Sequence, residues 1–478
     1  MIRHIFISIF FIILLAFCKP ADRRICGVSE FEDVIKVDSG WPVAVMLTAY
    51  RTTLVADGKD KTLLRLAVID STGREIQSAS NKIRIYIDGD GRVTAAIPGE
   101  KLSTETDTSG IEYFNYQLKD GLAWLTFHAG DRPDKIKVEV RSESLWAGSH
   151  EIHTIPADVE LMHPMADQIK PSGKVIERMI GADISFLPQF EDRGRKYYEK
   201  GVEKDPVKIL SEHGFNYIRL RIFVNPENVK GYSPGRGFCG LDHTLQMAQR
   251  VKDAGLKLLL NIHYSDYWAD PQQQNKPAEW ASLDFGSLED TVKNYTARVI
   301  RALESQGTPA DMVQIGNEIN HGLLWPDGHI SKPDQLAGLL KAGVEGVRKV
   351  DESMPVMMHL ALGGQNEEAV FWFDNMIARG VEFDVMGISY YPRWHGTLDD
   401  LKYNLADLVK RYKKPVNVVE YAIFRKEVHQ IVFKLPDNLG QGTCIWEPIG
   451  YRGKLFDRDG NVIEGMRLFE ELGATYLK

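Results

Sequence analysis

Two glutamates end apolar runs that lie about a hundred residues apart in the chain. Glu318 ends the run QIGNE at residues 314–318, and Glu420 ends the run NVVE at residues 417–420. Burying a carboxylate charge costs free energy, so an apolar strand rarely ends in a glutamate without a partner or a function. A single glutamate of this kind is as often half of a structural ion pair, whereas two that face each other are able to hold a sugar ring.

Paired carboxylates of this kind are the machinery of glycoside hydrolysis with retention of configuration. The two carboxyl groups must then lie about 5–5.5 Å apart. One attacks the anomeric carbon, and the other protonates the leaving oxygen and later activates water. Their pKa values must differ, so their surroundings must differ as well.

The elements that position these glutamates follow an alternating pattern of strands and helices from residue 170 onward. Helical patterns lie between the strands, for example at 241–254 and 288–303, and the pattern continues to the end of the chain. Eight strands, each followed by a helix, predict a (β/α)₈ TIM barrel over residues 170–478, within the α/β class. A doubly wound sheet would require a glycine-rich phosphate loop after the first strand, and the sequence has none. The expected strands are 181–186, 217–223, 257–265, 312–318, 355–363, 384–391, 415–422 and 442–448.

In a TIM barrel the carboxyl ends of all strands meet at one mouth, where active sites lie. Glu318 closes the fourth strand and Glu420 lies near the end of the seventh. These two strands lie across the mouth from each other, which places the two carboxylates face to face.

Residues 41–160 follow a different pattern, with short alternating runs such as 63–69 and 136–140 separated by turn signals such as Asp120-Gly121. This spacing predicts a small all-β sandwich. The stretch resembles the immunoglobulin-like accessory domains of bacterial β-galactosidases. The resemblance implies a spacer, with sugar binding as the alternative.

The first eighteen residues have the features of an export signal. Arg3 and His4 precede an apolar run, 5–17, that is too short to span a bilayer. The ending Leu-Ala-Phe-Cys resembles a bacterial lipoprotein signal, in which Cys18 is lipidated, although Phe17 stands where a small residue is usual. We therefore expect residues 1–18 to be a signal peptide and 19–40 a tether to the cell envelope; the alternative is a plain signal peptide.

Composition excludes several function classes. The chain has 478 residues and a formal net charge of -8, which argues against nucleic acid as a partner. The remaining cysteines, Cys26, Cys239 and Cys444, show no zinc-site spacing, and their odd number leaves at least one free thiol.

No HxH or HExxH pattern indicates a metal-dependent hydrolase. Asp457, Asp459 and Asn461 offer oxygen atoms at alternate positions, but this pattern fits a hairpin turn equally well. We expect no metal and no cofactor.

Several longer motifs carry a resemblance to one family. The segments HYSDYWADP at 263–271 and QIGNEI at 314–319 are the most specific. On these motifs, residues 181–448 resemble glycoside hydrolase family 53, the endo-β-1,4-galactanases. The resemblance implies retaining hydrolysis of β-1,4-galactan or arabinogalactan side chains of pectin. Further matching segments are 181–185, 217–221, 324–326, 389–392 and 446–448.

The resemblance implies that Glu318 is the acid/base and Glu420 the nucleophile. Asn317 is placed to bind the sugar 2-hydroxyl. An arginine near the end of the second strand should keep the nucleophile ionised. Arg219 and Arg221 point to the same face, and we favour Arg221 because it lies nearer the strand end.

The other expected substrate contacts lie in or after the third, fourth, sixth and eighth strands. His263, Asp266 and Asp270 suit hydrogen bonds to galactose hydroxyls. Aromatic rings pack on the apolar faces of sugars, and the candidates are Trp268, Trp325, Trp394 and Trp446. Tyr390 and Tyr391 end the sixth strand, where a tyrosine is placed to donate a hydrogen bond to the nucleophile, and Tyr390 is expected to bind the substrate.

The sequence departs from the family pattern at Asn261-Ile262, before the HYSD motif, and at Tyr421, after the nucleophile. These departures leave open a retaining barrel enzyme that cuts another polymer, such as β-1,3-galactan or mannan. A non-catalytic carbohydrate-binding surface lipoprotein is the alternative from another class, and the presence of both glutamates argues against it. We expect a monomer whose partners are a polysaccharide and the membrane.

Overall fold

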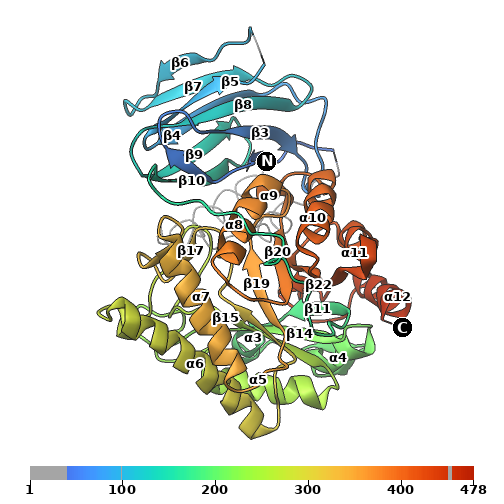
Figure 1. Cartoon of the computed structure of the whole chain (residues 1–478). Helices are drawn as coiled ribbons and strands as arrows, with labels where there is room; N and C mark the ends of the chain where they lie inside the picture. The colour runs from blue at the N-terminus through green and yellow to red at the C-terminus, as the bar shows by residue number, and fades with distance from the viewer. Residues whose placement is uncertain (1–39, 98, 451–454, 478) are drawn as a thin grey trace.

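The computed structural model describes residues 40–97, 99–450 and 455–477, which form a β-sandwich followed by a TIM barrel (Figure 1). The predicted fold class is confirmed. The expected signal peptide, with Cys18 and nearly all of the tether, lies outside the described residues, and so does Cys26.

The sandwich consists of one four-stranded and one six-stranded sheet. The first has the order β1-β3-β8-β5 and the second β2-β10-β9-β4-β7-β6. In β9, buried Ile136, Val138 and Val140 alternate with exposed or half-exposed charged residues, as expected for a strand with one face on a core. The strands are β1 (Ala44–Ala49), β2 (Thr53–Ala56), β3 (Lys61–Ile69), β4 (Lys82–Asp88), β5 (Gly91–Ala95), β6 (Ser103–Thr106), β7 (Glu112–Gln117), β8 (Leu122–Ala129), β9 (Lys135–Ser142) and β10 (Gly148–Pro156).

Eight parallel strands close the barrel in chain order. They are β11 (Met179–Asp183), β14 (Tyr217–Ile222), β15 (Lys257–Ile262), β16 (Met312–Ile315), β19 (Val356–Leu360), β20 (Val385–Tyr390), β21 (Val416–Tyr421) and β22 (Gly440–Trp446). All eight were predicted to within a few residues. Glu318 lies three residues beyond β16, and Glu420 lies within β21.

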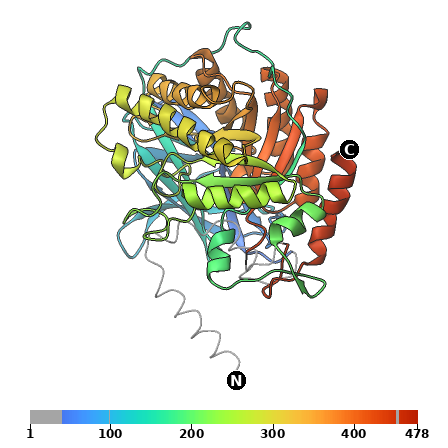
Figure 2. The same cartoon turned by 90° about the horizontal axis from the view of Figure 1, so that it is seen from below.

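The helices surround the strands, with the blue and teal sandwich behind the barrel in the view from below (Figure 2). Local signals mark their ends: Asp284 caps α6, which stops at Gly307 with φ 84°, and Thr397 and Asp400 form a capping box on α10. The α-helices are α3 (Leu187–Asp192), α4 (Pro206–Glu212), α5 (Leu241–Asp253), α6 (Phe285–Gln306), α7 (Pro333–Arg348), α8 (Asn366–Ala378), α9 (Pro392–His395), α10 (Leu398–Tyr412), α11 (Arg425–Phe433) and α12 (Arg467–Tyr476).

Shorter elements lie in the loops. They are the hairpins β12 (Tyr198–Glu199) with β13 (Val202–Glu203) and β17 (Gly322–Leu323) with β18 (Gly328–His329), and the 3₁₀ turns η2 (Ala278–Trp280), η3 (Pro436–Asn438) and η4 (Glu464–Met466). Within the part of the chain that the structure describes, no helix has both the length and the hydropathy needed to cross a membrane.

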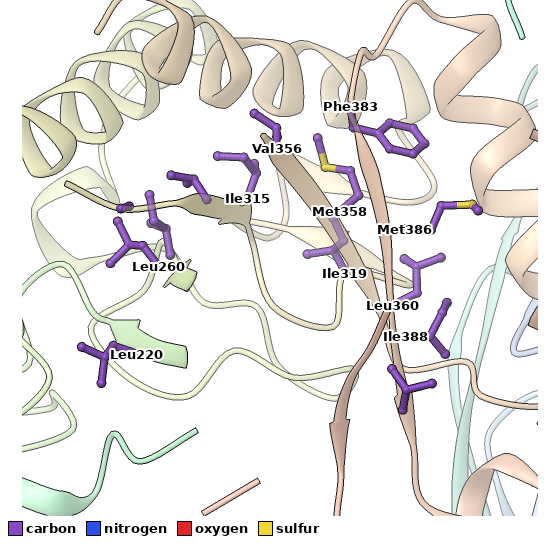
Figure 3. Packing of buried hydrophobic residues seen from close by; sticks show 14 of the residues in the cluster. Leu220, Leu260, Ile315, Ile319, Val356, Met358, Leu360, Phe383, Met386 and Ile388 are labelled. Atoms are coloured by element: carbon purple, nitrogen blue, oxygen red, sulfur yellow. The ribbon is translucent and has the colours of Figure 1, made fainter. Parts of the chain in front are cut away.

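Alternation along the strands separates two apolar layers. Leu260 and Met358 pack outward among the residues between strands and helices (Figure 3), while their neighbours Leu259 and Met357 fill the interior. The interior layer takes one residue from each strand: Met179, Tyr217, Leu259, Met312, Met357, Val385, Val419 and Cys444. The barrel is therefore closed below and presents its polar interior residues at the carboxyl ends of its strands.

The sandwich is docked on the barrel through buried polar contacts. Oε2 of Glu368 on α8 accepts hydrogen bonds from the backbone N–H groups of Thr52 and Thr53, at 2.9 and 3.0 Å. The hydroxyl of Thr52 lies 3.1 Å from Nε2 of His321. Strand β10 lies on the side of the sandwich that faces the barrel (Figure 1).

Candidate active site

A cavity of about 220 Å³ opens at the carboxyl ends of the barrel strands. Glu318 and Glu420 both line it. One carboxylate oxygen of each glutamate lies within 4.8 Å of the other. This separation fits the retaining arrangement and is too short for the inverting one, which needs roughly 6.5–9.5 Å to admit a water.

Two donors hold the carboxylate of Glu420. Nη1 of Arg219 lies 2.9 Å from its Oε2, and the hydroxyl of Tyr391 lies 2.9 Å from its Oε1. Hydrogen bonds from a cation and from a hydroxyl stabilise a charged carboxylate. Glu420 is therefore suited to act as a nucleophile.

Glu318 lies in the opposite environment. Burial, followed by the negative charge of Glu420, raises the pKa of Glu318 well above its usual value. The hydroxyl of Ser389 donates a hydrogen bond to Oε1 of Glu318 at 2.7 Å, and this bond lowers the pKa of Glu318 in part. A raised pKa favours the protonated carboxylic acid, so Glu318 is suited to act as a general acid.

The backbone of Glu318 adopts φ 49°, in the left-handed region that non-glycine residues seldom occupy. Around it, His359 on β19 bridges two site residues: its Nε2 lies 2.8 Å from Oγ of Ser389, and its Nδ1 lies 3.1 Å from Oδ1 of Asn317. The strained turn after β16 and this histidine together fix the acid in the cleft.

Arg219, and not Arg221, contacts the nucleophile, so the preference for Arg221 is wrong. Nη1 of Arg221 instead lies 2.9 Å from Oε1 of Glu447, and its guanidinium lies 4.3 Å from the ring centroids of Phe186 and Trp268. Side-chain alternation fixes the face of a residue but not its height, because barrel strands are tilted and staggered.

Asn317 lines the cavity, as predicted for a residue that binds the sugar 2-hydroxyl. Its Oδ1 accepts a hydrogen bond from Nη2 of Arg219 at 2.8 Å, and its Nδ2 donates to the carbonyl of Ala269 at 2.9 Å. These contacts fix the amide plane, so the side chain is already oriented before a ligand binds.

The profile of glycosyl hydrolase family 53 matches residues 179–431, from β11 into α11. The chain belongs to glycosyl hydrolase family 53. An uncharacterized protein of Niallia circulans is 39% identical over 312 residues, which are 56% of this chain and 83% of that protein. The arabinogalactan endo-β-1,4-galactanase of Humicola insolens is 37% identical over 249 residues, 50% of this chain and 72% of that enzyme.

Solved structures agree with this membership. The family 53 catalytic domain of Ignisphaera aggregans has a TM-score of 0.58 and 33% identity, and the match covers 63% of this chain and 98% of that one. Fungal β-1,4-galactanases give a TM-score of 0.56 at 29% identity, over 61% and 98% of the two chains. Residues 45–151, which form most of the sandwich, match glycoside hydrolase family 2 C-terminal domain 5.

In this family 53 chain, the loop after β15 places three of its four predicted contact residues at the cavity. His263, Trp268 and Asp270 line the cavity, and burial raises the pKa of Asp270 to about 6. Asp266 does not line it. Its two oxygens accept hydrogen bonds from the backbone N–H groups of Asn225 and Ala278, at 3.0 and 2.9 Å. Asp266 thus holds the loop together, and the prediction that it binds sugar is wrong.

The aromatic predictions are also divided. Trp446 and Trp394 line the cavity, whereas Trp325 packs against His153 and His329 beneath the sandwich. Tyr391 donates to the nucleophile and lines the cavity, whereas Tyr390 does not line it, so the prediction that Tyr390 binds substrate is wrong. Tyr390 is buried, and its hydroxyl donates to the carbonyl of Gly396 at 3.2 Å.

Sequence reasoning missed several site residues. Asp183, His359 and Ser389 lie at or near the carboxyl ends of β11, β19 and β20, and these polar residues in apolar strands carry the signal that revealed the glutamates. The sandwich residues at the cavity do not stand at the ends of apolar barrel strands, so the sequence carries no such signal for them. Those that line the cavity are Thr52, Ser149, His150 and Glu151.

Glu318, His359 and Glu420 bring three potential metal ligands within 4.8 Å of one another. The donor set suits a cation poorly. Arg219 already places a positive charge on Glu420, and polar partners occupy both ring nitrogens of His359.

Two further predictions concern residues away from the cleft. Oδ1 of Asp457 accepts the backbone N–H groups of Asp459 and Asn461, at 2.9 and 2.8 Å, as in a hairpin turn. Cys239 and Cys444 are both buried free thiols.

Proposed function

We propose that this chain is an endo-β-1,4-galactanase that hydrolyses the β-1,4-galactan or arabinogalactan side chains of pectin with retention. The observation that carries the proposal is the close approach of Glu318 and Glu420 in contrasting environments at the barrel mouth. The galactanases among the family 53 relatives support the choice of substrate.

In the first step, a carboxylate oxygen of Glu420 attacks the anomeric carbon. The bond from this carbon to the glycosidic oxygen breaks, and the carboxylic acid of Glu318 gives its proton to that oxygen. In the second step, Glu318 takes a proton from water, the water oxygen attacks the anomeric carbon, and Glu420 leaves as a carboxylate. Asn317 binds the 2-hydroxyl in both steps.

The remaining cavity residues bind and orient the sugar chain. The rings of Trp268, Trp394 and Trp446 offer stacking surfaces for apolar sugar faces. His263 and Asp270 offer hydrogen bonds to hydroxyls.

The proposal extends to the location of the enzyme. The signal-like first eighteen residues and Cys18 support export and lipid anchoring at the cell envelope. A lipid tether and a polymer substrate require no second subunit, so the enzyme acts as a monomer. Loss of membrane association in Cys18→Ala tests the anchor.

Product analysis on four polymers tests the activity: pectic β-1,4-galactan, mannan, xylan and β-1,3-galactan. The expected result is release of short galacto-oligosaccharides from the first polymer alone, abolished in Glu318→Gln and Glu420→Gln. Cleavage of another polymer would overturn the substrate and keep the mechanism. Absence of cleavage on all four would contradict an enzymatic function.

A further inference from the structure

Strand β10 of the sandwich contributes side chains to the catalytic cleft. Ser149, His150 and Glu151 are consecutive on β10 and line the same cavity as the two glutamates. A domain that served only as a spacer would have no reason to place side chains there.

Contacts across the domain boundary hold β10 and the neighbouring strand β9 against the barrel. Nε2 of His150 lies 3.1 Å from the carbonyl oxygen of Trp394, and Nζ of Lys135 lies 2.8 Å from the carbonyl oxygen of Gln272. Both partners also line the cavity. Glu368 also binds backbone N–H groups at the start of β2, which pairs with β10. These contacts make β10 a fixed wall of the cleft.

The wall has the chemistry of a sugar-binding surface. Ser149 and Glu151 lie two residues apart on one face of β10 and bring a hydroxyl and a carboxylate. His150 lies between them and is tied to the backbone of Trp394, which also lines the cavity. Hydrogen-bonding groups together with an aromatic residue suit a pyranose.

The side chain of Glu151 is 15% exposed and lies 2.8 Å from Nζ of Lys135, so the carboxylate is held rather than free to rotate. Its charge adds to the burial that raises the pKa of Asp270, which places the two carboxyls in one electrostatic environment.

The position of the wall identifies which part of the substrate it meets. The acid Glu318 must contact the glycosidic oxygen, and the leaving sugar extends from that oxygen. The sandwich binds His321, three residues after Glu318, and also the loops that carry Trp394 and Gln272.

The opposite side of the cleft is built without the sandwich. Asp183, Arg221 and Trp446 come from β11, β14 and β22, next to the strand of the nucleophile or beyond it. The wall therefore stands on the side of the leaving group.

We propose that Ser149, His150 and Glu151 form a subsite for a sugar on the leaving-group side of the cleft, so that the sandwich is part of the substrate-binding machinery. This inference rests on the proposed function, which supplies the polysaccharide and the roles of the two glutamates. It replaces the expectation that the sandwich is mainly a spacer.

The test uses two full-length variants of the wall. Ser149→Trp fills the subsite, and Glu151→Gln removes its charge while keeping the shape. Glu112→Gln on β7 is the matched control, because Glu112 is an exposed glutamate of the same domain. Each protein is assayed on β-1,4-galactohexaose, labelled with ¹⁸O at its reducing end, and on 4-nitrophenyl β-1,4-galactobioside, which has no sugar on the leaving side.

We expect kcat/KM on the hexaose to fall about tenfold or more in Ser149→Trp and several-fold in Glu151→Gln. The aryl substrate should change less than twofold in both, and Glu112→Gln should match the wild type on both substrates. The labelled products should also show fewer cleavages that leave two or more sugars on the leaving side.

Thermal unfolding first checks that Ser149→Trp is folded. If it is, unchanged kcat/KM on the hexaose in both wall variants would overturn the inference. Equal losses on both substrates would overturn it as well, because they would place the effect on the other side of the cleft or in the fold. A wild type that cuts no β-1,4-galactan would instead overturn the proposed function. The leaving-side subsite would then be tested by the same comparison on oligosaccharides of the polymer that the wild type cuts.

Discussion

Glu318 and Glu420 share one cleft but differ in the donors that reach them. Arg219 and Tyr391 donate to Glu420. Glu318 is half-buried and accepts a hydrogen bond from the hydroxyl of Ser389. The same residue type is thereby suited to two roles, as retaining hydrolysis requires.

Neighbouring tyrosines give a matched test of the donors to Glu420. Tyr391→Phe removes a buried hydrogen bond to a charged group, which contributes about 1.5–3 kcal/mol, so kcat on galactan should fall roughly 10- to 100-fold. Tyr390→Phe loses only the bond to the carbonyl of Gly396, so kcat should stay within about twofold while unfolding free energy falls by about 1 kcal/mol. Steady-state kinetics and urea unfolding measure both effects, and equal losses of kcat would contradict the assignment.

Two substitutions should move the alkaline limb of kcat/KM in opposite directions. The Ser389 hydroxyl lowers the pKa of Glu318, so in Ser389→Ala this pKa rises and the acid stays protonated to higher pH. The charge of Asp270 raises the pKa of Glu318, so in Asp270→Asn the limb moves to lower pH. Measuring kcat/KM on an oligogalactoside from pH 4 to 10 shows the direction in which each limb moves. If the alkaline limb moved in the same direction in both variants, Glu318 would not be the group that controls it.

At the scale of elements, strand ends are the most predictable feature of the molecule. The eight barrel strands and both glutamates follow from apolar runs that end in polar residues. The choice between Arg219 and Arg221 does not, because strand tilt and stagger set the height of a side chain and leave no mark in one strand's sequence. An aspartate such as Asp266 is a common sugar-binding residue. Only the folded loop shows that its carboxylate already accepts hydrogen bonds from backbone N–H groups.

A histidine cluster joins β10 to the loop after β16. Nδ1 of His153 lies 3.0 Å from Nε2 of His329, and its ring stacks on His321 with centroids 3.8 Å apart. Burial, with Lys135 and Lys332 nearby, lowers the pKa of His329 to about 4. Burial likewise lowers the pKa of His321 to about 3.

These depressed pKa values predict a loss of stability in acid. The folded protein binds fewer protons than the unfolded chain below about pH 6.5, so stability is complete above that pH and is lost as pH falls toward about 4. Replacing His329 with Gln should remove roughly 2 kcal/mol of this loss between pH 7 and 4.5. Thermal unfolding of both proteins at the two pH values measures the difference. Equal losses in wild type and variant would show that His329 is not buried as a neutral ring.

At the scale of the whole molecule, the two domains form one cleft. Their separate folds could be predicted, because each has its own periodicity. The contribution of β10 could not, because Ser149, His150 and Glu151 gain their meaning only from packing against loops more than a hundred residues away. The docking contacts of Thr52 and Thr53 with Glu368 are equally non-local.

The central claim is that the two glutamates hydrolyse β-1,4-galactan by double displacement. The most direct measurement is ¹H NMR of the anomeric protons of the first products released from β-1,4-galactohexaose, before mutarotation. The account predicts that the new reducing ends appear first as the β-anomer and only later equilibrate with the α-anomer. Initial release of the α-anomer would mean inversion and would contradict the assignment of Glu420 as a nucleophile.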